Sequence, residues 1–189
     1  MICLLGRTCV GKDTILKQLI SNLGYKPVVT YTTRPMRNGE VDGVDYHFID
    51  KSQFRRMKIQ GFFAETTSYN VATGDTWYYG TLLKDLNDDS IIILNPEGLR
   101  TLKQNKDLNI VSFLITAKEE TLRERLSKRG DKPEEAERRL KADRKDFADI
   151  SELVDFSFSN DLGIGVNELS ALIHTTYSHV NDNKNKQGA

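Results

Sequence analysis

The chain has 189 residues, of which 38% are hydrophobic and 29% are charged. That length and mixture suit one folded domain with an apolar core, and they exclude a disordered or membrane-embedded chain. Lys plus Arg and Asp plus Glu number 27 each, so the formal net charge is zero. A neutral chain argues against bulk binding to nucleic acid or to an anionic membrane, and we predict neither partner.

The start of the chain lacks the features of an export signal. Ile2–Leu5 is a short apolar run that ends at Gly6, whereas a signal peptide needs a basic start and a longer apolar stretch. The two cysteines, Cys3 and Cys9, cannot build a disulfide framework. We therefore expect a reduced, cytoplasmic protein.

Apolar runs and turn residues predict the elements of the N-terminal half. A helix is expected over Lys12–Leu23, ended by Gly24, and a polar loop over Thr32–Asp45. Asp50 is expected to cap a further helix, with Gln53 at the reciprocal position. The predicted strands are Ile2–Leu5, Val28–Tyr31, Tyr46–Ile49, and a hairpin of Phe62–Tyr69 and Thr76–Tyr79 joined around Ala72–Asp75.

The C-terminal half alternates between strand and helix patterns. Strands are predicted over Ser90–Leu94, Ile110–Ile115 and Val154–Phe158. A capping box at Thr116–Glu119 is expected to begin a charged helix, and further helices are predicted over Pro133–Ile150 and Leu162–Tyr177. The polar residues 181–189 are expected to be disordered.

This alternation predicts an α/β fold in which helices flank a parallel sheet. Two glycines and a lysine spaced as Gly6, Gly11 and Lys12, between the first strand and the first helix, indicate a sheet of the P-loop NTPase type. The stretch from about Tyr31 to Tyr79 interrupts the alternation and favours antiparallel pairing, so we expect a small mixed insert there. The expected single domain has a core of about 1–30, 81–125 and 145–180. A small mixed insert of about 31–80 and a helical segment of about 126–144 complete it.

The first candidate site is a glycine-bounded loop between the first strand and the first helix. Gly6-Arg-Thr-Cys-Val-Gly11-Lys12 has the spacing of a P-loop, and the strand–loop–helix setting supports that interpretation. Backbone N–H groups and the helix N-terminus can surround phosphates, and Lys12 can reach the β- and γ-phosphates. The predicted ATP-binding residues of this loop are Gly6, Arg7, Thr8, Cys9, Val10, Gly11, Lys12, Asp13 and Thr14.

The residue after Lys12 departs from the P-loop pattern. That pattern has Ser or Thr, whose hydroxyl binds Mg²⁺, whereas this chain has Asp13 followed by Thr14. A carboxylate is a suitable oxygen ligand for Mg²⁺, directly or through water. We therefore predict Mg²⁺ bound together with ATP, and Asp13 as its candidate ligand.

The second candidate site is the loop between Thr32 and Phe48. Arg34 and Arg37 lie three residues apart, and Tyr46 follows them. Arginine forks bind phosphate through two parallel hydrogen bonds, and a tyrosine hydroxyl adds another donor. A second phosphate-binding loop beside a P-loop indicates a phosphorylated acceptor.

The same loop resembles the signature of guanylate kinases. Residues 32–48 read Thr-Thr-Arg-x-x-Arg-x-x-Glu-x-x-Gly-x-x-Tyr-x-Phe, and the N-terminal P-loop fits that family. Further matches in the family's order are Tyr78-Tyr79-Gly80-Thr81, Arg125-Leu126, Arg129-Gly130, Arg139-Leu140 and Asn160-Asp161-Leu162. The resemblance spans Ile2 to the last helix and implies ATP-dependent phosphorylation of GMP or dGMP.

The resemblance also implies roles for individual residues. Glu65 matches the glutamate that reads guanine, and Thr81 a hydroxyl residue at the base, whereas Thr30 replaces a family serine near the acceptor phosphate and keeps its hydroxyl. Arg34, Arg37, Tyr46 and Tyr79 match residues that hold the acceptor phosphate, and Asn95 adds a polar contact. Arg125, Arg129 and Arg139 match lid arginines, and Asn160 a residue near adenine. The catalytic residues so implied are Lys12, Arg34, Arg129 and Arg139.

Two departures from the family pattern affect the site. In the family, the strand equivalent to Ser90–Leu94 ends in an Asp-x-Asp pattern, whereas this chain has Ile93-Leu94-Asn95 there. Our hypothesis is that Asp13 partly compensates by supplying a carboxylate from the P-loop. The segment Tyr69–Trp77 is also longer than the usual family hairpin.

Two other functions remain as alternatives. Ribose 1,5-bisphosphate phosphokinases resemble guanylate kinases and can carry an aspartate after the P-loop lysine, whereas non-catalytic guanylate-kinase-like modules bind phosphopeptides. The intact acceptor signature with Glu65 favours a nucleotide over the first, and the intact Gly11-Lys12 favours an enzyme over the second. The choice between GMP and dGMP and the oligomeric state stay open.

Overall fold

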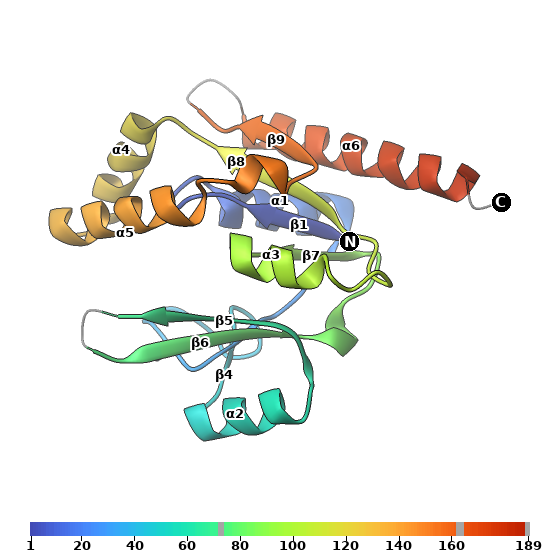
Figure 1. Ribbon diagram of the computed structural model, residues 1–189. Helices are drawn as coiled ribbons and strands as arrows, with labels where there is room; N and C mark the ends of the chain where they lie inside the picture. Colours follow the sequence, from blue (N-terminus) through green and yellow to red (C-terminus); the bar gives the residue numbers. More distant parts are fainter. Residues whose placement is uncertain (72–73, 162–164, 188–189) are drawn as a thin grey trace.

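The computed structural model describes residues 1–71, 74–161 and 165–187. Its larger body contains a five-stranded sheet in the order β2-β7-β1-β8-β9, with every neighbouring pair parallel (Figure 1). The strands are β1 (Ile2–Leu5), β2 (Lys26–Pro27), β7 (Ser90–Ile93), β8 (Val111–Thr116) and β9 (Phe156–Ser159). The predicted parallel α/β fold is confirmed.

The central strand β1 is buried on both sides, as its unbroken apolar sequence predicts. Ile2 and Leu4 point into one apolar cluster, together with residues of α1 (Lys12–Leu23), α4 (Glu119–Arg129) and α6 (Val166–Gln187). Cys3 and Leu5 point into a second cluster on the opposite face, with α3 (Pro96–Leu102). Alternation of side chains along one strand therefore joins two cores.

The smaller body is the predicted insert (Figure 1). Its sheet has the order β4-β3-β6-β5 and mixes one parallel pair with two antiparallel pairs. The elements are β3 (Tyr31–Thr32), β4 (His47–Phe48), α2 (Lys51–Ile59), β5 (Phe63–Asn70) and β6 (Thr76–Leu82). As predicted, the Asp50 side chain caps α2 by accepting from the Gln53 backbone N–H at 2.7 Å.

The insert has its own small apolar centre between α2 and the hairpin. Phe54 is 2% exposed and stacks on Phe63 with ring centroids 4.6 Å apart. A side chain at Gly80 would put its Cβ atom 2.8 Å from the Phe63 ring, so only glycine fits there. This packing holds one face of the hairpin against α2. The opposite face of the hairpin is directed towards α3 of the larger body.

Helices α4 and α5 (Pro133–Asp146) form an arm beside the sheet (Figure 1). Leu140 is the buried residue of α5, and the other contacts between the two helices include ion pairs such as Arg123–Glu137 at 2.6 Å. Arg144 reaches Glu119 across the pair of helices. A single apolar anchor and many exposed charges are typical of an element that can move relative to its sheet.

The strand predicted over Val28–Tyr31 is wrong, because the chain leaves the core sheet inside that range. The Val28 backbone N–H still donates to Ile91 of the core at 3.0 Å. Two residues later, the Thr30 carbonyl accepts from His47 of the insert at 3.0 Å. The apolar run thus connects two sheets, ending β2 and beginning β3.

The capping box predicted at Thr116–Glu119 is also wrong. Thr116 is the last residue of β8, and Lys118 is the N-cap of α4 without a side-chain hydrogen bond of its own. The Asp161 carboxylate accepts instead from the Lys118 N–H at 2.7 Å and the Thr121 hydroxyl at 3.1 Å. A residue distant in sequence therefore takes the capping role.

The last helix extends through Gln187, so helix replaces the disorder predicted for residues 181–187. Leu169, Ile173 and Tyr177 recur at four-residue spacing and bury one side of α6 against the core. The predicted helix start at Leu162, the hairpin residue Ala72 and the tail residues 188–189 lie outside the described residues. No helix in the described part of the chain has both the length and the apolar character needed to cross a membrane.

Candidate functional site

The predicted P-loop lies between β1 and α1, as its sequence requires. The Lys12 ammonium is turned back onto this loop and donates to the carbonyls of Gly6 at 2.7 Å and Arg7 at 3.1 Å. Burial lowers the pKa of Lys12, while the nearby carboxylates of Asp13 and Asp143 oppose that shift. The cation is therefore held at the loop by weak carbonyl acceptors, which a phosphate group can replace.

The loop depends on close backbone packing at both glycines. A Cβ atom at Gly6 would lie 2.5 Å from the Ile115 carbonyl oxygen. At Gly11, where φ is 102°, it would lie 2.5 Å from the Asn160 side-chain nitrogen. Cys9 has a φ of 56° and is the one residue other than glycine with positive φ in the described parts of the chain.

Arg125 and Asn160 fasten the loop from outside. The Arg125 guanidinium donates to the carbonyls of Val10 at 3.1 Å and Asn160 at 2.8 Å. The Asn160 amide donates to the same Val10 carbonyl at 2.7 Å. Both residues border the cavity, and these bonds give them a supporting role in loop geometry.

A cavity of about 460 Å³ opens beside the loop, a volume typical of small-ligand sites. It brings together P-loop residues, α4, and the region after β9. Its lining residues are Cys9, Gly11, Lys12, Asp13, Thr14, Arg125, Arg129, Asn160, Asp161 and Val166. Seven of these ten residues were predicted to bind ATP, and an eighth, Arg129, was predicted to be catalytic. The seven are Cys9, Gly11, Lys12, Asp13, Thr14, Arg125 and Asn160.

The two other lid arginines are paired with acidic residues of the arm. Arg129 donates to Asp131 through Nε at 2.5 Å and Nη2 at 2.9 Å. Arg139 lies 3.4 Å from Asp131 and donates to Glu135 at 2.7 Å. One carboxylate, Asp131, thus brings both arginines together, and the Arg129 guanidinium holds the pKa of that carboxyl below its usual value.

The structure adds a contact between the arm and the P-loop that the sequence analysis missed. The Asp143 carboxylate of α5 accepts from the Thr8 backbone N–H at 2.6 Å. Burial raises the pKa of Asp143, although this hydrogen bond and Lys12 oppose the shift. No local signal marks Asp143, because an acidic residue on a charged helix normally faces solvent.

Arg7 also turns away from the loop centre. Its guanidinium donates to Glu119 at 3.3 Å, and Glu119 further binds Arg123 and Arg144. Contact with these arginines, Arg144 first, lowers the pKa of Glu119 to about 2. The first variable residue of the P-loop is thereby tied to both helices of the arm.

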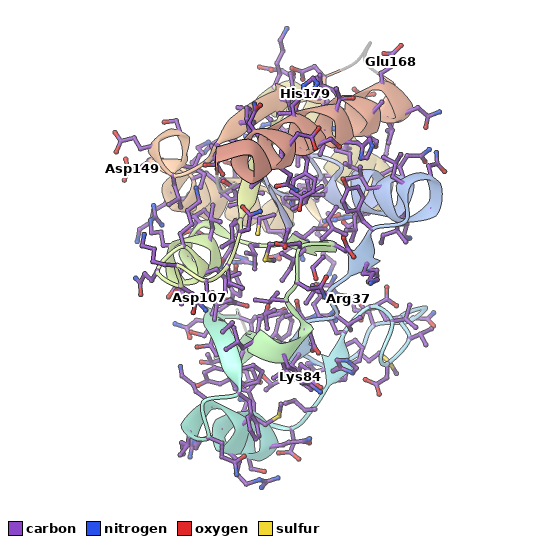
Figure 2. The ribbon with its side chains drawn as sticks, turned by 90° about the vertical axis from the view of Figure 1, so that its right-hand side faces the viewer. Arg37, Lys84, Asp107, Asp149, Glu168 and His179 are labelled. Atoms are coloured by element: carbon purple, nitrogen blue, oxygen red, sulfur yellow. The ribbon has the colours of Figure 1, made fainter. Side chains whose placement is uncertain are left out.

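In the insert, Arg34 is 4% exposed and is paired with Glu40 at 2.7 Å. The other Glu40 oxygen accepts from the Arg37 backbone N–H at 2.7 Å. Sequence reasoning missed this role of Glu40, although the residue is part of the loop signature. Arg37 itself is exposed, and Figure 2 labels it on the part of the insert that approaches the core.

Three tyrosines make a continuous aromatic wall next to Arg34. The Arg34 guanidinium lies 5.2 Å from the Tyr46 ring centroid. Tyr46 meets Tyr79 edge to face at 6.0 Å, and Tyr79 meets Tyr69 in the same way at 5.6 Å. The structure therefore brings together the predicted phosphate-binding residues Arg34, Tyr46 and Tyr79.

Glu65 and Thr81 form a buried polar pair between the two strands of the same hairpin. Glu65 is 4% exposed, and its Oε1 accepts from the Thr81 hydroxyl at 2.6 Å. Burial raises the pKa of Glu65, because a buried carboxylate loses hydration. A Cβ atom at Gly98 of α3 would lie 3.2 Å from both Glu65 Oε2 and Asn95 Oδ1, so the core helix closely approaches this carboxylate.

The remaining predicted residues occupy different places. Asn95 caps α3, with Oδ1 accepting from the Gly98 N–H at 2.8 Å. Thr30 lies at the crossing between the two sheets and holds β4 through its backbone carbonyl. Asp13 is exposed in the first turn of α1, and no cluster of three or more metal-ligating side chains occurs among the described residues.

Comparison with known proteins places these features in context. A family model described as "Guanylate kinase" matches residues 1–175. The chain is 33% identical over 176 residues to a guanylate kinase of Symbiobacterium thermophilum, covering 92% of this chain and 83% of that protein. It is 34% identical over 169 residues to a guanylate kinase of Nitratidesulfovibrio vulgaris, covering 85% and 79%.

A solved structure shares the fold. The crystal structure of guanylate kinase from Anaplasma phagocytophilum matches with a TM-score of 0.69 at 22% sequence identity. The match covers 95% of this chain and 84% of that one. A structural match at 22% sequence identity supports the fold alone. The assignment to the family rests on the family model and on the more similar sequence relatives.

Proposed function

The chain belongs to the guanylate kinase family, and from that premise we propose that its two phosphate-binding sites transfer the γ-phosphate of ATP to GMP or dGMP. The observation that carries the assignment to a guanine acceptor is the buried Glu65–Thr81 pair, located in the same insert as Arg34, Tyr46 and Tyr79. A carboxylate accepts from both N1–H and the 2-amino group of guanine, a pattern that adenine lacks.

ATP occupies the cavity next to the P-loop in this proposal. Residues Gly6–Thr14 surround the phosphates with backbone N–H groups, and Lys12 moves from the loop carbonyls to the β- and γ-phosphates. Arg125 and Asn160 keep the loop in shape through Val10. The adenosine part extends along the cavity wall formed by Asn160, Asp161 and Val166.

The acceptor binds to the insert in this proposal. Arg34, Arg37, Tyr46 and Tyr79, with the Thr30 hydroxyl, hold its phosphate, and Glu65 and Thr81 contact its base. An oxygen of the GMP phosphate attacks the γ-phosphorus, and the bond from that phosphorus to the bridging oxygen breaks with its electron pair leaving on ADP. The nucleophile is already anionic, so the step needs no general base.

The arm supplies the lid, which we assign to about residues 126–144. Arg129 and Arg139 exchange Asp131 and Glu135 for the oxygens of the triphosphate when the lid closes. The core of about 1–30, 81–125 and 145–180 carries ATP, and the insert of about 31–80 carries the acceptor. Closure excludes water, which prevents hydrolysis of ATP.

The residues after Lys12 fit a magnesium ion bound with ATP. Asp13 is exposed beside the cavity, and Thr14 adds a hydroxyl oxygen, which are the donor types that Mg²⁺ prefers. When bound, the ion neutralises charge on the phosphates of ATP. Asp13 and Thr14 are the residues that would hold it.

The decisive experiment measures ADP release from Mg·ATP with GMP, dGMP, AMP, CMP, UMP and ribose 1,5-bisphosphate as parallel acceptors. We expect turnover with GMP and dGMP alone, because Glu65 discriminates by the guanine edge. Turnover on the ribose bisphosphate would show that the acceptor site reads no base. ATP binding without any turnover would indicate a non-catalytic module.

A matched pair of lysine variants ties that turnover to the P-loop. Lys12→Ala should lower kcat by about a hundredfold or more, because it removes a cation from the transferring phosphate. Lys17→Ala, an exposed change in the same helix α1, should leave kcat within about twofold. Equal kcat in both variants would contradict the proposed ATP site.

A further inference from the structure

Tyr69 lies on the face of the hairpin that carries the proposed acceptor site. Side chains alternate along a strand, so Glu65, Thr67 and Tyr69 of β5 share one face. In the antiparallel register Glu65 pairs with Thr81, and Thr67 pairs with Tyr79. Tyr69 therefore continues the row that begins at the base-reading end and passes Tyr79.

Its hydroxyl group has one hydrogen bond in the structure, and the direction of that bond is defined. Asn95 Oδ1 accepts from the Gly98 N–H at 2.8 Å, which orients the amide so that Nδ2 faces the insert. Asn95 Nδ2 then donates to the Tyr69 oxygen at 2.5 Å. The phenolic proton thus remains available, and no acceptor for it occurs among the described residues.

The position of this proton suits the middle of a bound nucleotide. The Tyr69 ring meets Tyr79 at 5.6 Å, so it extends the aromatic wall that begins at Arg34 and Tyr46. A nucleotide with its base at Glu65 and its phosphate at Arg34 must place its sugar between these ends. Tyr69 itself lies beyond Tyr79 in the row, but its hydroxyl is bonded to Asn95 of the core. Asn95 Oδ1 and Glu65 Oε2 both lie 3.2 Å from the Cβ position of Gly98, so this hydroxyl is directed back towards the base-reading end. Tyr69 is 40% exposed and is accessible to such a ligand.

We propose that Tyr69 reads the sugar of the acceptor nucleotide by donating its phenolic proton to a ribose hydroxyl, with Asn95 holding the ring in place. This inference rests on the proposed function and adds the sugar to the base and phosphate contacts. Desolvation raises the pKa of Tyr69 to about 12 although the hydrogen bond from Asn95 opposes the shift, and Asp146, Tyr79 and Asp143 add smaller increases. The hydroxyl therefore keeps its proton throughout the neutral range.

The test compares kcat/KM for GMP, 2′-deoxy-GMP and 3′-deoxy-GMP in the wild type and in Tyr69→Phe. The ratio of GMP to the deoxynucleotide that lacks the recognised hydroxyl should be about ten in the wild type and fall to about one in the variant. The deoxynucleotide whose ratio changes identifies whether the 2′- or the 3′-hydroxyl is recognised. Phenylalanine keeps the ring contact with Tyr79, so the change isolates the hydroxyl.

Tyr78→Phe is the matched control. Tyr78 lies on the opposite face of β6, where its ring is 5.6 Å from Phe54, and it should leave all three ratios unchanged. Thermal unfolding of both variants checks that each is folded, and isothermal titration with GMP and the two deoxynucleotides reports the same ratios independently of turnover.

Two outcomes would overturn the inference. An equal loss on all three nucleotides in Tyr69→Phe would mean that the hydroxyl acts on the phosphate or only holds the hairpin to the core. Equal use of the three nucleotides by the wild type would mean that no hydroxyl is read. In both cases guanine-specific turnover persists, whereas absence of any GMP turnover in the wild type would overturn the proposed function itself.

Discussion

Arg34 illustrates how one residue of the site is prepared for its ligand. A guanidinium that is 4% exposed needs a counter-charge, and Glu40 supplies it at 2.7 Å. The Tyr46 and Phe48 rings lie against its faces, with ring centroids 5.2 and 5.6 Å away. Glu40 also bonds the Arg37 N–H, so a single carboxylate orients the loop that carries both arginines.

The residues at positions 13 and 95 lead to a testable prediction about the proposed Mg²⁺ site, because Asp13 and Asn95 both depart from the family pattern. If Asp13 replaces the carboxylate that the family has at position 95, Asp13→Ser should lower kcat by about tenfold or more. Adding Asn95→Asp should restore part of that loss, because a carboxylate returns to the strand end. Steady-state kinetics over a Mg²⁺ titration will measure both variants and the Asn95→Asp single variant.

Strict additivity of the two changes would contradict this compensation. Asn95 also caps α3 and binds Tyr69, and an aspartate at this position retains the cap through Oδ1 while losing the donor to Tyr69. The Asn95→Asp single variant therefore measures the change in kcat caused by losing that donor. This change is subtracted from the change in kcat of the double variant.

At the scale of elements, the arm is attached to the core by few apolar and several polar contacts. Leu140 anchors α5, while Glu119 joins Arg7 of the P-loop to Arg144 of α5. Exposed ion pairs contribute little to stability and are easily exchanged. This composition suits a lid whose arginines change partners during each cycle.

Asp143 is expected to weaken ATP binding in the present arrangement of the arm. Its carboxylate accepts from the Thr8 N–H and adds a negative charge beside the phosphate site. Asp143→Asn keeps an acceptor for that N–H and removes the charge. We expect the Kd for ATP to fall about fivefold, equivalent to about 1 kcal/mol of repulsion at short range, measured by isothermal titration.

The matched control is Asp149→Asn, which changes an exposed carboxylate that Figure 2 places on the outer surface of the core. It should leave the Kd unchanged. Wild-type affinity in Asp143→Asn would show that the carboxylate does not oppose ATP binding, and lower affinity would show that it supports the nucleotide-bound loop.

At the scale of the whole molecule, the acceptor site lowers stability. Burial raises the pKa of Glu65 above its value in the unfolded chain. The folded protein therefore binds more protons between the two pKa values, and the free energy of unfolding falls as the pH rises through that interval. The penalty is complete above the folded-state pKa and vanishes below the unfolded value of about 4.3.

Glu65→Gln should accordingly raise the Tm at pH 8 by about 2–4 °C, and this difference should shrink towards pH 4. The same change should lower kcat/KM for GMP by about a hundredfold, because the amide offers a donor where guanine also donates. Scanning calorimetry from pH 4 to 8 will measure the first effect. Glu152→Gln, at an exposed position, serves as control and should change neither quantity.

A variant Tm that is equal to or below the wild-type Tm at pH 8 would contradict the conclusion that the buried charge is unfavourable. The Thr81 hydroxyl can still donate to the glutamine oxygen, so loss of this hydrogen bond would not account for such a result.

The amino-acid sequence by itself determined the two candidate phosphate-binding loops, because each is built from contiguous residues. Gly6–Lys12 folds into a P-loop through local backbone conformation, and the signature of residues 32–48 places Arg34, Glu40 and Tyr46 on one loop. The parallel sheet and the mixed insert also follow from apolar periodicity. Where the sequence failed, at Val28–Tyr31 and Thr116–Glu119, a short pattern was open to more than one local structure.

Only the tertiary structure decided which distant groups meet. Asp143 reaches Thr8 across 135 positions, Asn160 reaches Val10 across 150, and Asn95 reaches Tyr69 across 26. The sheet order β2-β7-β1-β8-β9 brings the ends of β1 and β9 to one edge, which sets the Asn160–Val10 pair, whereas the other two pairs depend on how α5 and the insert pack on the core. Local propensity acts over a few residues, whereas such contacts form only when burial of the two apolar cores fixes the strand order.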